Sequence, residues 1–491
     1  MRLRNLVLVL LFLSQNLYAD PAHWTQNVKT VTLKNGLTAI IYPRGTAPIF
    51  SGYIRVKAGG MDEEVGKTGL AHFLEHMAFK GTEKIGTRNY EKEKPLMEKI
   101  EKIAIDLAAE EGRKNQDVKK IESLKKELKT LQSEQSQYIV KEEVSKIMLD
   151  HGGVDYNATT SKDMTSYFVN LPSEQFNFWA QFESDRIFRP VFREFYEERD
   201  VVMEERRMRV EDDPDGKLYE AFLDTAFEKS PYKWPTIGTW KDLKTLTRTD
   251  LEKFWRRYYQ PSNVVLAIVG KVDPDKVIPV LEKTFGKIPA SSSDIEPSHI
   301  TEEPKQEKAK RVSISIHAKP RFMVGYHKPT LPSDEDYIFD IIQQVLLDGR
   351  TSRLYKKLVL EDQVASSVHG GGGTPGSRLN HLFTIDVDLR DGKTTDQAMN
   401  VIREELKKLA TDGVTSRELE KTKNALSMAF VNRLRTNEGL AEDLSYYQVV
   451  AGDWKYLENY MDKISKFRSE DVKKVAAKYF VNSNETIAEI K

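Results

Sequence analysis

The stretch "TGLAHFLEHMAFKGTEK", Thr68 to Lys84, constrains the fold more than any other part of the sequence. It places His72, Glu75 and His76 within five residues, in a chain of 491 residues that has only nine histidines. Residues four apart on an α-helix lie on one face, so two imidazoles here can bind one metal ion, with Glu75 beside them. The bland alternative is a helix with two partly buried, hydrogen-bonded histidines.

The His-x-x-Glu-His order is the inverted zincin signature. A catalytic zinc site needs three protein ligands and one open position for water, and a nearby carboxylate accepts the proton of that water. Glu75 suits this role of base. The segment "FYEERDVVMEERRMRV" offers Glu198 and Glu205, seven residues apart on one helix face. Either could be the third ligand while the other supports the site, and spacing alone does not choose between them.

Length and charge limit the classes of protein that fit. A chain of 491 residues is too long for one hydrophobic core, so two or more domains are expected. Lys and Arg total 75, as do Asp and Glu, which gives no electrostatic reason to expect nucleic acid or an acidic membrane as partner. The absence of cysteine excludes disulfides and lipidation at a signal-peptide cysteine.

The N-terminus is typical of an export signal. Residues 1–19 contain the basic "MRLRN", the apolar run "LVLVLLFL" and a small residue, Ala19, at the expected cleavage position. An eight-residue apolar run is too short to span a bilayer, and no later run is long enough. We therefore expect an exported mature protein without a membrane span, most simply in a bacterial periplasm; the alternative is an uncleaved N-terminal anchor.

The mature chain divides at a polar stretch. Residues 290–311 are rich in Ser, Pro, Glu and Lys, which is typical of an exposed linker. Strand and helix patterns alternate similarly in residues 20–289 and 312–491, which indicates a structural duplication. Within the first part, residues 91–148 are dense in Lys and Glu and carry two narrow apolar seams of coiled-coil type. They predict an antiparallel helical hairpin, which is either a solvated spacer or a contact arm.

One glycine motif matches the dinucleotide-binding pattern but not the structural context which that pattern needs. "GGGTPG" places Gly371, Gly373 and Gly376 in a G-x-G-x-x-G pattern. A dinucleotide site needs that pattern to open a helix directly after a strand, whereas Pro375 and a polar loop follow here. No nucleotide is expected.

These motifs resemble the M16 metallopeptidases, the family of pitrilysin, insulinase and mitochondrial processing peptidase. "GLAHFLEHMAFKGT", "GGVDYNATTSKDMTSYFVNLP", "ERDVVMEE" and "YYQPSNVVLAIVGKVDP" carry the resemblance, which extends over nearly all of the mature chain. It implies two related α+β domains, each an antiparallel-rich sheet covered by helices, with the zinc site in the first. It also implies that His72, His76 and Glu205 bind Zn²⁺, that Glu75 is catalytic and that Glu198 supports the site from outside.

The resemblance also predicts how a peptide binds. In this family an extended substrate adds as a strand to a sheet edge near the zinc. The matching segment is 154–160, with Asn157, Ala158 and Thr159 as expected substrate-binding residues. The alternative is an ordinary edge strand or loop.

The second half departs from the family pattern. Complete members carry an arginine and a tyrosine, seven residues apart, that approach the substrate, and these positions fall here on Val359 and Ser366. Neither side chain can replace them. The chain is therefore predicted to be the zinc-bearing subunit of a two-chain peptidase whose second M16-type subunit supplies the pair, with a homodimer possible; a shifted register, or a subfamily that dispenses with the pair, is the alternative.

The predicted function is cleavage of peptides or unfolded polypeptide segments by a zinc endopeptidase. The alternative from another class is a non-catalytic scaffold or assembly subunit, which this family includes; such members have usually lost metal residues. The sequence does not distinguish an enzyme that processes one dedicated precursor from a general peptide degrader.

Overall fold

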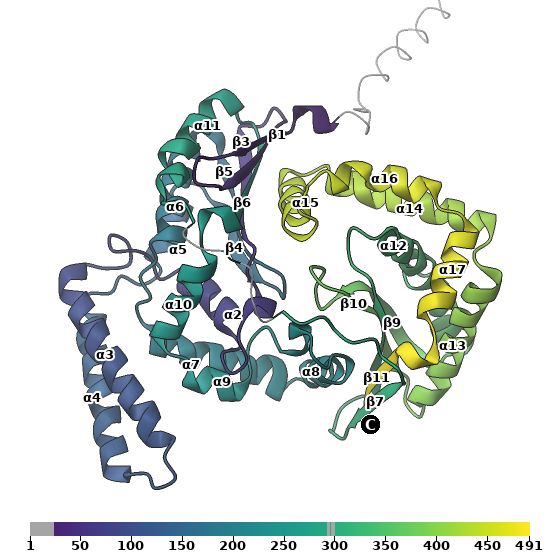
Figure 1. Cartoon of the computed structure of the whole chain (residues 1–491), viewed down its shortest axis with the longest axis horizontal. Helices are drawn as coiled ribbons and strands as arrows, with labels where there is room; N and C mark the ends of the chain where they lie inside the picture. The colour runs from purple at the N-terminus through teal and green to yellow at the C-terminus, as the bar shows by residue number, and fades with distance from the viewer. Residues whose placement is uncertain (1–23, 292–294, 296–299) are drawn as a thin grey trace, which may run out of the picture.

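The chain forms two sheets, each covered by helices (Figure 1), in a computed structural model that describes residues 24–291, 295 and 300–491. The predicted export signal, residues 1–19, lies outside the described residues, as does part of the predicted linker. The predicted fold class, two related domains with antiparallel-rich sheets, is confirmed.

The two sheets share one topology. The first has the order β1-β2-β6-β3-β5-β4 and the second β7-β11-β8-β10-β9. In each, the strand that comes last in the chain lies inside the sheet, parallel to one neighbour and antiparallel to the other. The strands of the first sheet are β1 (Lys29–Thr32), β2 (Thr38–Pro43), β3 (Ile49–Val56), β4 (Val154–Thr160), β5 (Thr165–Pro172) and β6 (Val264–Gly270). Those of the second are β7 (Lys310–Ile314), β8 (Arg321–Lys328), β9 (Ala365–Thr374), β10 (His381–Leu389) and β11 (Glu485–Ile490).

The helices follow the same division. Those of the first half are α2 (Leu70–Met77), α3 (Tyr90–Glu111), α4 (Val118–Ser136), α5 (Glu143–Asp150), α6 (Phe176–Phe188), α7 (Phe195–Arg206), α8 (Pro214–Ala226), α9 (Trp240–Thr245), α10 (Arg248–Tyr258) and α11 (Pro274–Lys283). Those of the second half are α12 (Asp334–Leu346), α13 (Thr395–Asp412), α14 (Ser416–Arg433), α15 (Asn437–Val450), α16 (Tyr456–Lys466) and α17 (Ser469–Tyr479). Short helical turns include η2 (Gly60–Asp62) and two π-helical segments, η4 (Arg207–Glu211) and η8 (Tyr355–Glu361).

Each half lends one helix to the other half's sheet. Strand β6 is buried along its whole length because both its faces are covered. Leu266 and Ile268 face the core of the first half, whereas Val265 and Val269 face a core continuous with the second half, where α15 packs on β6 and β3. In return, α8 packs on β11, β7 and β8. This exchange fixes the two halves against each other through two separate apolar contacts, one on each sheet.

The predicted helical hairpin is present. Helices α3 and α4 pack side by side and project away from both sheets (Figure 1). Asn89 and Asp117 cap the two helix starts, each accepting a hydrogen bond from a backbone N–H three residues on. The role of the hairpin as spacer or contact arm stays open.

The predicted domain bounds stay predictions. One detail differs from the expected linker of 290–311: β7 already begins at Lys310, because it pairs in parallel with β11.

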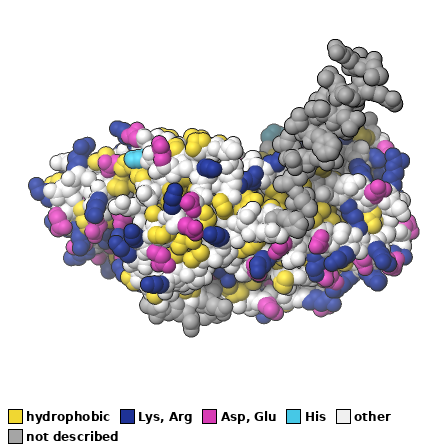
Figure 2. All heavy atoms as spheres, turned by 90° about the horizontal axis from the view of Figure 1, so that it is seen from above, with side chains coloured by type: hydrophobic (Ala, Val, Ile, Leu, Met, Phe, Trp, Pro, Cys, Tyr) yellow, Lys and Arg dark blue, Asp and Glu magenta, His cyan; other side chains and the backbone are white. Residues whose placement is uncertain are grey.

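On the face shown in Figure 2, basic and acidic side chains are interspersed over the described surface, in keeping with the balanced charge. Among the described residues, no helix is long and apolar enough to cross a membrane.

Candidate metal centre

Helix α2 presents two faces of opposite character. Its buried side chains form one wall of the core of the first half: Leu70, Ala71, Phe73, Leu74 and Met77. His72, Glu75 and His76 fall between these positions and lie on the other face, half-buried. The centroids of the two imidazole rings are 4.8 Å apart, as residues one helical turn apart require.

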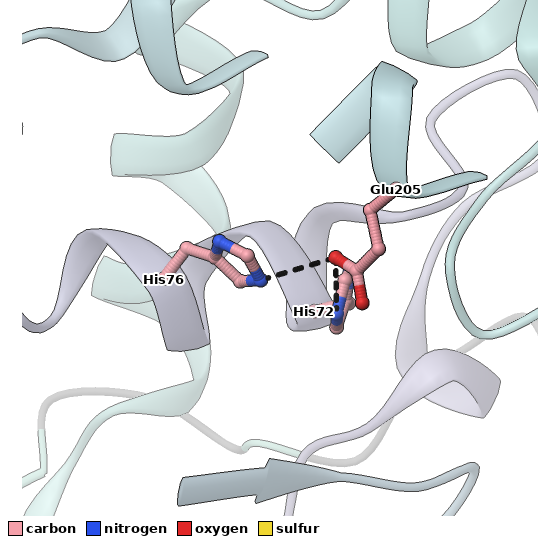
Figure 3. A group of neighbouring side chains, drawn as sticks. All are labelled: His72, His76 and Glu205. Carbon is pink, nitrogen blue, oxygen red and sulfur yellow. Dashed lines mark ion pairs between the residues drawn. The ribbon is translucent and has the colours of Figure 1, made fainter. Parts of the chain in front are cut away.

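Glu205 reaches the two histidines from the last turn of α7. Its Oε2 lies 3.6 Å from Nε2 of His72 and 3.4 Å from Nε2 of His76 (Figure 3). One ligand atom from each of these residues lies within 4.8 Å of the others. Directly beyond Glu205, α7 widens into the π-helical η4, a local distortion that often accompanies functional sites.

The three residues fit a metal ion. Oε2 of Glu205 and Nδ1 of His72 are buried and have no hydrogen-bond partner among the described residues. A buried carboxylate oxygen that faces two imidazole nitrogens without a hydrogen bond is what a bound cation would satisfy. Tetrahedral zinc with ligand bonds of about 2.0–2.1 Å holds its ligand atoms roughly 3.3 Å apart, close to the 3.4 and 3.6 Å found here.

Glu198 contacts the outer side of the same imidazole pair. Its Oε1 accepts a hydrogen bond from Nδ1 of His76 at 2.8 Å, and its Oε2 pairs with Nζ of Lys80 at 2.7 Å. A proton held on Nδ1 means that the neutral imidazole of His76 has its lone pair on Nε2, the nitrogen that faces Glu205. Glu205 therefore faces the Nε2 atoms of both histidines, whereas Glu198 contacts the Nδ1 atom of His76, a distinction that helix spacing left open.

Glu75 lies on the floor of the same site. Thr160, the last residue of β4, donates a hydrogen bond from its hydroxyl to Oε2 of Glu75 at 2.5 Å. Burial raises the pKa of Glu75, and the bond from Thr160 opposes this rise in part. A carboxylate with a raised pKa is better matched to accept a proton near neutral pH.

The two histidines differ in their protonation. Burial, reinforced by the neighbouring His76, lowers the pKa of His72 to about 4. Burial also lowers the pKa of His76, but the carboxylates of Glu198 and Glu205 outweigh it and raise this pKa to about 9. Of the two histidines, His76 is therefore the one that carries a second proton at neutral pH, and a cation bound at its Nε2 would displace that proton.

An open cavity of about 990 Å³ leads to this group. Asn157, Ala158 and Thr159 of β4 line it together with the histidines. Strand β4 is the edge of the first sheet and pairs only with β5 among the described residues. The predicted substrate-binding residues thus lie in the same cavity as the two histidines and Glu205, on a strand whose outer edge can accept another strand.

The second half contributes none of the described residues that line this cavity. Val359 lies in η8 with its side chain buried in the core of the second half. Ser366 lies in β9 and donates its hydroxyl to the carbonyl oxygen of Asp388. At the positions where the family resemblance expects an arginine and a tyrosine, this chain therefore offers one core side chain and one short surface hydroxyl.

Three contacts of the site were not foreseen from the sequence. They are Thr160 on Glu75, Lys80 on Glu198, and Arg209, whose Nε lies 3.0 Å from Oε1 of Glu205. Arg209 follows Glu205 by four positions, so helical spacing could have revealed its contact. Lys80 lies beyond the end of α2 and contacts a residue of α7, which local spacing does not reveal. Thr160 has no such local signal, because the approach of β4 to α2 decides its contact.

Comparison with known proteins agrees with this architecture. The model described as insulinase, peptidase family M16, matches residues 46–131 and 128–240, and the model described as peptidase M16 inactive domain matches residues 245–426. The zinc protease PqqE of Helicobacter pylori is 27% identical over 473 residues, covering 94% of this chain and 92% of that protein. The uncharacterised zinc protease YmxG of Bacillus subtilis is 22% identical over 468 residues, covering 92% of this chain and 96% of that protein.

Solved structures agree as well. A protease from Helicobacter pylori superposes with a TM-score of 0.79 at 26% identity, covering 94% of this chain and 99% of that one. A peptidase M16 inactive domain from Pseudomonas fluorescens superposes with a TM-score of 0.74 at 15% identity, covering 94% and 97%. The family models together extend over most of the chain, and the two-sheet fold matches its structural neighbours. The chain therefore belongs to peptidase family M16.

Proposed function

We propose that this chain is the metal-bearing subunit of a zinc endopeptidase. The observation that carries the proposal is the convergence of His72, His76 and Glu205 around one point, with Glu75 beside them in an open cavity. A bound zinc ion would lower the pKa of a water ligand and polarise the substrate carbonyl. The names of its zinc-protease relatives support the choice of metal.

The residues of the site divide the work. His72, His76 and Glu205 hold the ion, and Glu198 keeps His76 in the tautomer and orientation that binding requires. Glu75 accepts the proton of the attacking water, with its carboxylate held by Thr160. After cleavage the same carboxylate can return a proton to the leaving amine.

An extended peptide would add to the free edge of β4. Main-chain hydrogen bonds to 157–159 would place the scissile bond over the metal, independent of most side chains. This mode suits unfolded segments, because a folded substrate has no free strand to offer. Val201 and Met208, more than half exposed in the same cavity, offer apolar contact for a side chain of the substrate.

A second M16-type subunit would complete the site. The support is that Val359 and Ser366 occupy the positions of the family's arginine and tyrosine. The missing groups would come from a different chain or a second copy. We further propose export to a periplasm, on the basis of the N-terminal sequence.

The decisive experiment compares wild type with Glu75→Gln. Both proteins are purified with any co-purifying partner from the native source, assayed for zinc, and incubated with unfolded polypeptide. The variant should keep zinc and lose cleavage. Cleavage at the wild-type rate by the variant would refute the role of Glu75, and zinc-free wild type without cleavage would favour the scaffold alternative.

A further inference from the structure

A loop of the second half contacts two segments that adjoin the residues of the candidate metal centre. It is the β9–β10 turn, residues 375–380, which carries the end of the glycine motif noted in the sequence. We propose that Arg378 in this turn is a positioning residue for the metal centre, through which the half without metal ligands orders the half that has them. The proposal rests on the zinc site proposed above.

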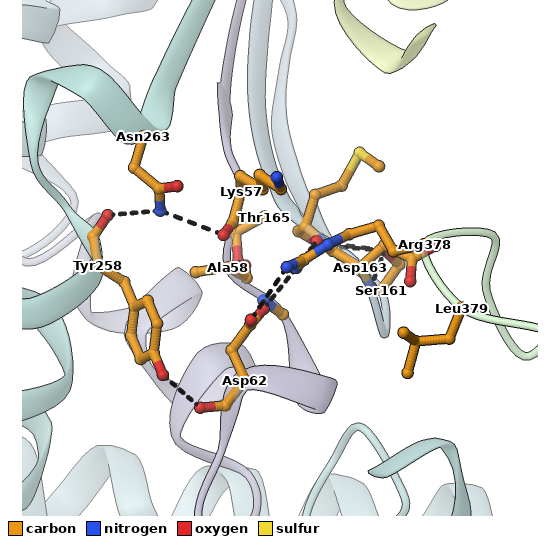
Figure 4. A network of polar contacts seen from close by, with 12 residues as sticks. Lys57, Ala58, Asp62, Ser161, Asp163, Thr165, Tyr258, Asn263, Arg378 and Leu379 are labelled. Atoms are coloured by element: carbon orange, nitrogen blue, oxygen red, sulfur yellow. Dashed lines mark hydrogen bonds and ion pairs between the residues drawn. The ribbon is translucent and has the colours of Figure 1, made fainter. Parts of the chain in front are cut away.

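The first contact of Arg378 is with Asp62 (Figure 4). Its Nη1 lies 2.7 Å from Oδ2 and its Nη2 3.2 Å from Oδ1 of the carboxylate. The Asp62 side chain is 1% exposed and that of Arg378 9%. Oδ2 of Asp62 also accepts the N–H of Gly59 at 2.9 Å, so the carboxylate fixes its own backbone turn, η2. A buried, two-pronged pair of this kind has a defined geometry.

The residue after Asp62 holds the metal helix. Oε2 of Glu63 accepts the N–H of Gly69 at 2.8 Å, and Oε1 accepts the N–H of Ala71 at 2.7 Å. Gly69, at the N-cap of α2, has φ of 96° and no side chain to cap the helix. Glu63 therefore satisfies the free N–H groups at the start of α2, one residue before His72. Because Arg378 fixes η2 and Glu63 directly follows η2, Arg378 also helps to fix the position of α2, which carries the two histidines.

The second contact of Arg378 is with the turn after β4, the strand whose last residue binds the general base Glu75. Its Nη1 donates to the carbonyl oxygen of Asp163 at 2.9 Å, and Oδ2 of Asp163 accepts the N–H of Ser377. Asp163 lies in the turn that directly follows β4. The last residue of β4, Thr160, holds Glu75 through its hydroxyl. One guanidinium thus ties together the two segments that place the histidines and the general base.

The fit of the turn depends on Gly376. A Cβ at this position would lie 2.6 and 2.7 Å from the carboxylate oxygens of Asp163 and 2.7 Å from the hydroxyl of Tyr232. That hydroxyl donates to Asp163 and accepts the N–H groups of Arg378 and Leu379 at 2.9 and 3.0 Å. Any larger residue at 376 must displace either the turn or the Asp163 and Tyr232 side chains that hold it, which offers a second perturbation that leaves Arg378 intact.

The test compares Arg378→Met, Arg378→Lys and Gly376→Ala in the full chain. Arg44→Met is the matched control, because Arg44 also bridges the halves, donating to the carbonyl oxygen of Arg435 at 3.0 Å, but touches neither η2 nor the turn after β4. Zinc affinity is measured by competition with a chromogenic chelator, and folding by circular dichroism and thermal unfolding of the metal-free chain.

We expect about tenfold weaker zinc binding in Arg378→Met and Gly376→Ala, with partial recovery in Arg378→Lys. Arg44→Met should bind zinc within twofold of wild type even where its melting temperature falls. In the active assembly, kcat should fall more than KM rises. If Arg378→Met does not fold, Gly376→Ala decides.

Zinc affinity within twofold of wild type in folded Arg378→Met and Gly376→Ala would overturn the positioning role. An equal loss of zinc affinity in Arg44→Met would also overturn it, because this would show that any contact holding the two halves together has the same effect on zinc binding. An assembly of the wild-type chain with its partner subunit that binds zinc but cleaves no peptide would refute the proposed function and leave the affinity comparison valid.

Discussion

Glu198 should govern how tightly the site holds zinc, although it is not placed as a ligand. Its carboxylate accepts the Nδ1 proton of His76 at 2.8 Å, and burial keeps the pair largely out of water. A hydrogen bond to a charged group contributes about 1.5–3 kcal/mol. Since about 1.4 kcal/mol corresponds to a factor of ten in an equilibrium constant, Glu198→Gln should weaken zinc binding by roughly 10- to 100-fold.

The assay is competition for zinc with a chelator of known affinity at pH 7.5, on protein first stripped of metal. Glu197→Gln is the matched control, because it removes one half-buried negative charge from the same helix without lining the metal cavity. Lys80 loses the nearer of its two carboxylate partners in the Glu198 variant, so Lys80→Met is measured beside it to separate that effect. Zinc affinity within twofold of wild type in folded Glu198→Gln would refute the argument that Glu198 orients His76.

Three further predictions concern the general base, a buried histidine of the second half and a buried glycine of the first. Glu75→Gln should retain zinc and lower the rate of peptide hydrolysis by about 10²- to 10⁴-fold, measured on a quenched fluorescent peptide, because the variant lacks the base. His381 is buried beside Lys328, and these surroundings lower its pKa from 6.5 to about 3. The unfolded chain therefore binds this proton first, so the free energy of unfolding should fall below pH 6.5, by about 1.4 kcal/mol at pH 5.5 in urea titrations. Gly52→Ala should cost about 1–3 kcal/mol of stability, measured in the same way, because its Cβ would lie 2.8 Å from the ring of Trp179.

Each of these has a clear contrary outcome. Hydrolysis by Glu75→Gln at a tenth of the wild-type rate or more would contradict its role as base. His381→Asn should abolish the share of the pH dependence assigned to His381; an unchanged pH profile would show that other groups cause it. For Gly52, the control is Gly112→Ala at the exposed end of α3, which should leave the urea midpoint nearly unchanged. A midpoint of Gly52→Ala equal to that of the control would contradict the clash with Trp179.

Much of the architecture was predictable because its signals are local. The hairpin of α3 and α4 follows from apolar spacing within single helices, and the turn between β1 and β2 follows from Asn35-Gly36, where the glycine adopts φ of 92°. The duplication could be recognised from the order of strand and helix patterns. The exchange of α8 and α15 between the sheets could not, because an amphipathic helix records that it has a buried face but not which sheet covers that face.

The sequence by itself determined the chemistry of the site. The spacing of His72, Glu75 and His76 on one helix, and of Glu198 and Glu205 on another, is a consequence of helical periodicity and requires no knowledge of the fold. Only the tertiary structure decided which glutamate faces the imidazole Nε2 atoms and that Thr160 meets Glu75. It also decided that Arg378 pairs with Asp62, more than 300 positions earlier in the chain. Those contacts depend on how separate elements cross in space, and the free energy that fixes the crossings comes from the packing of the whole core rather than from any one segment.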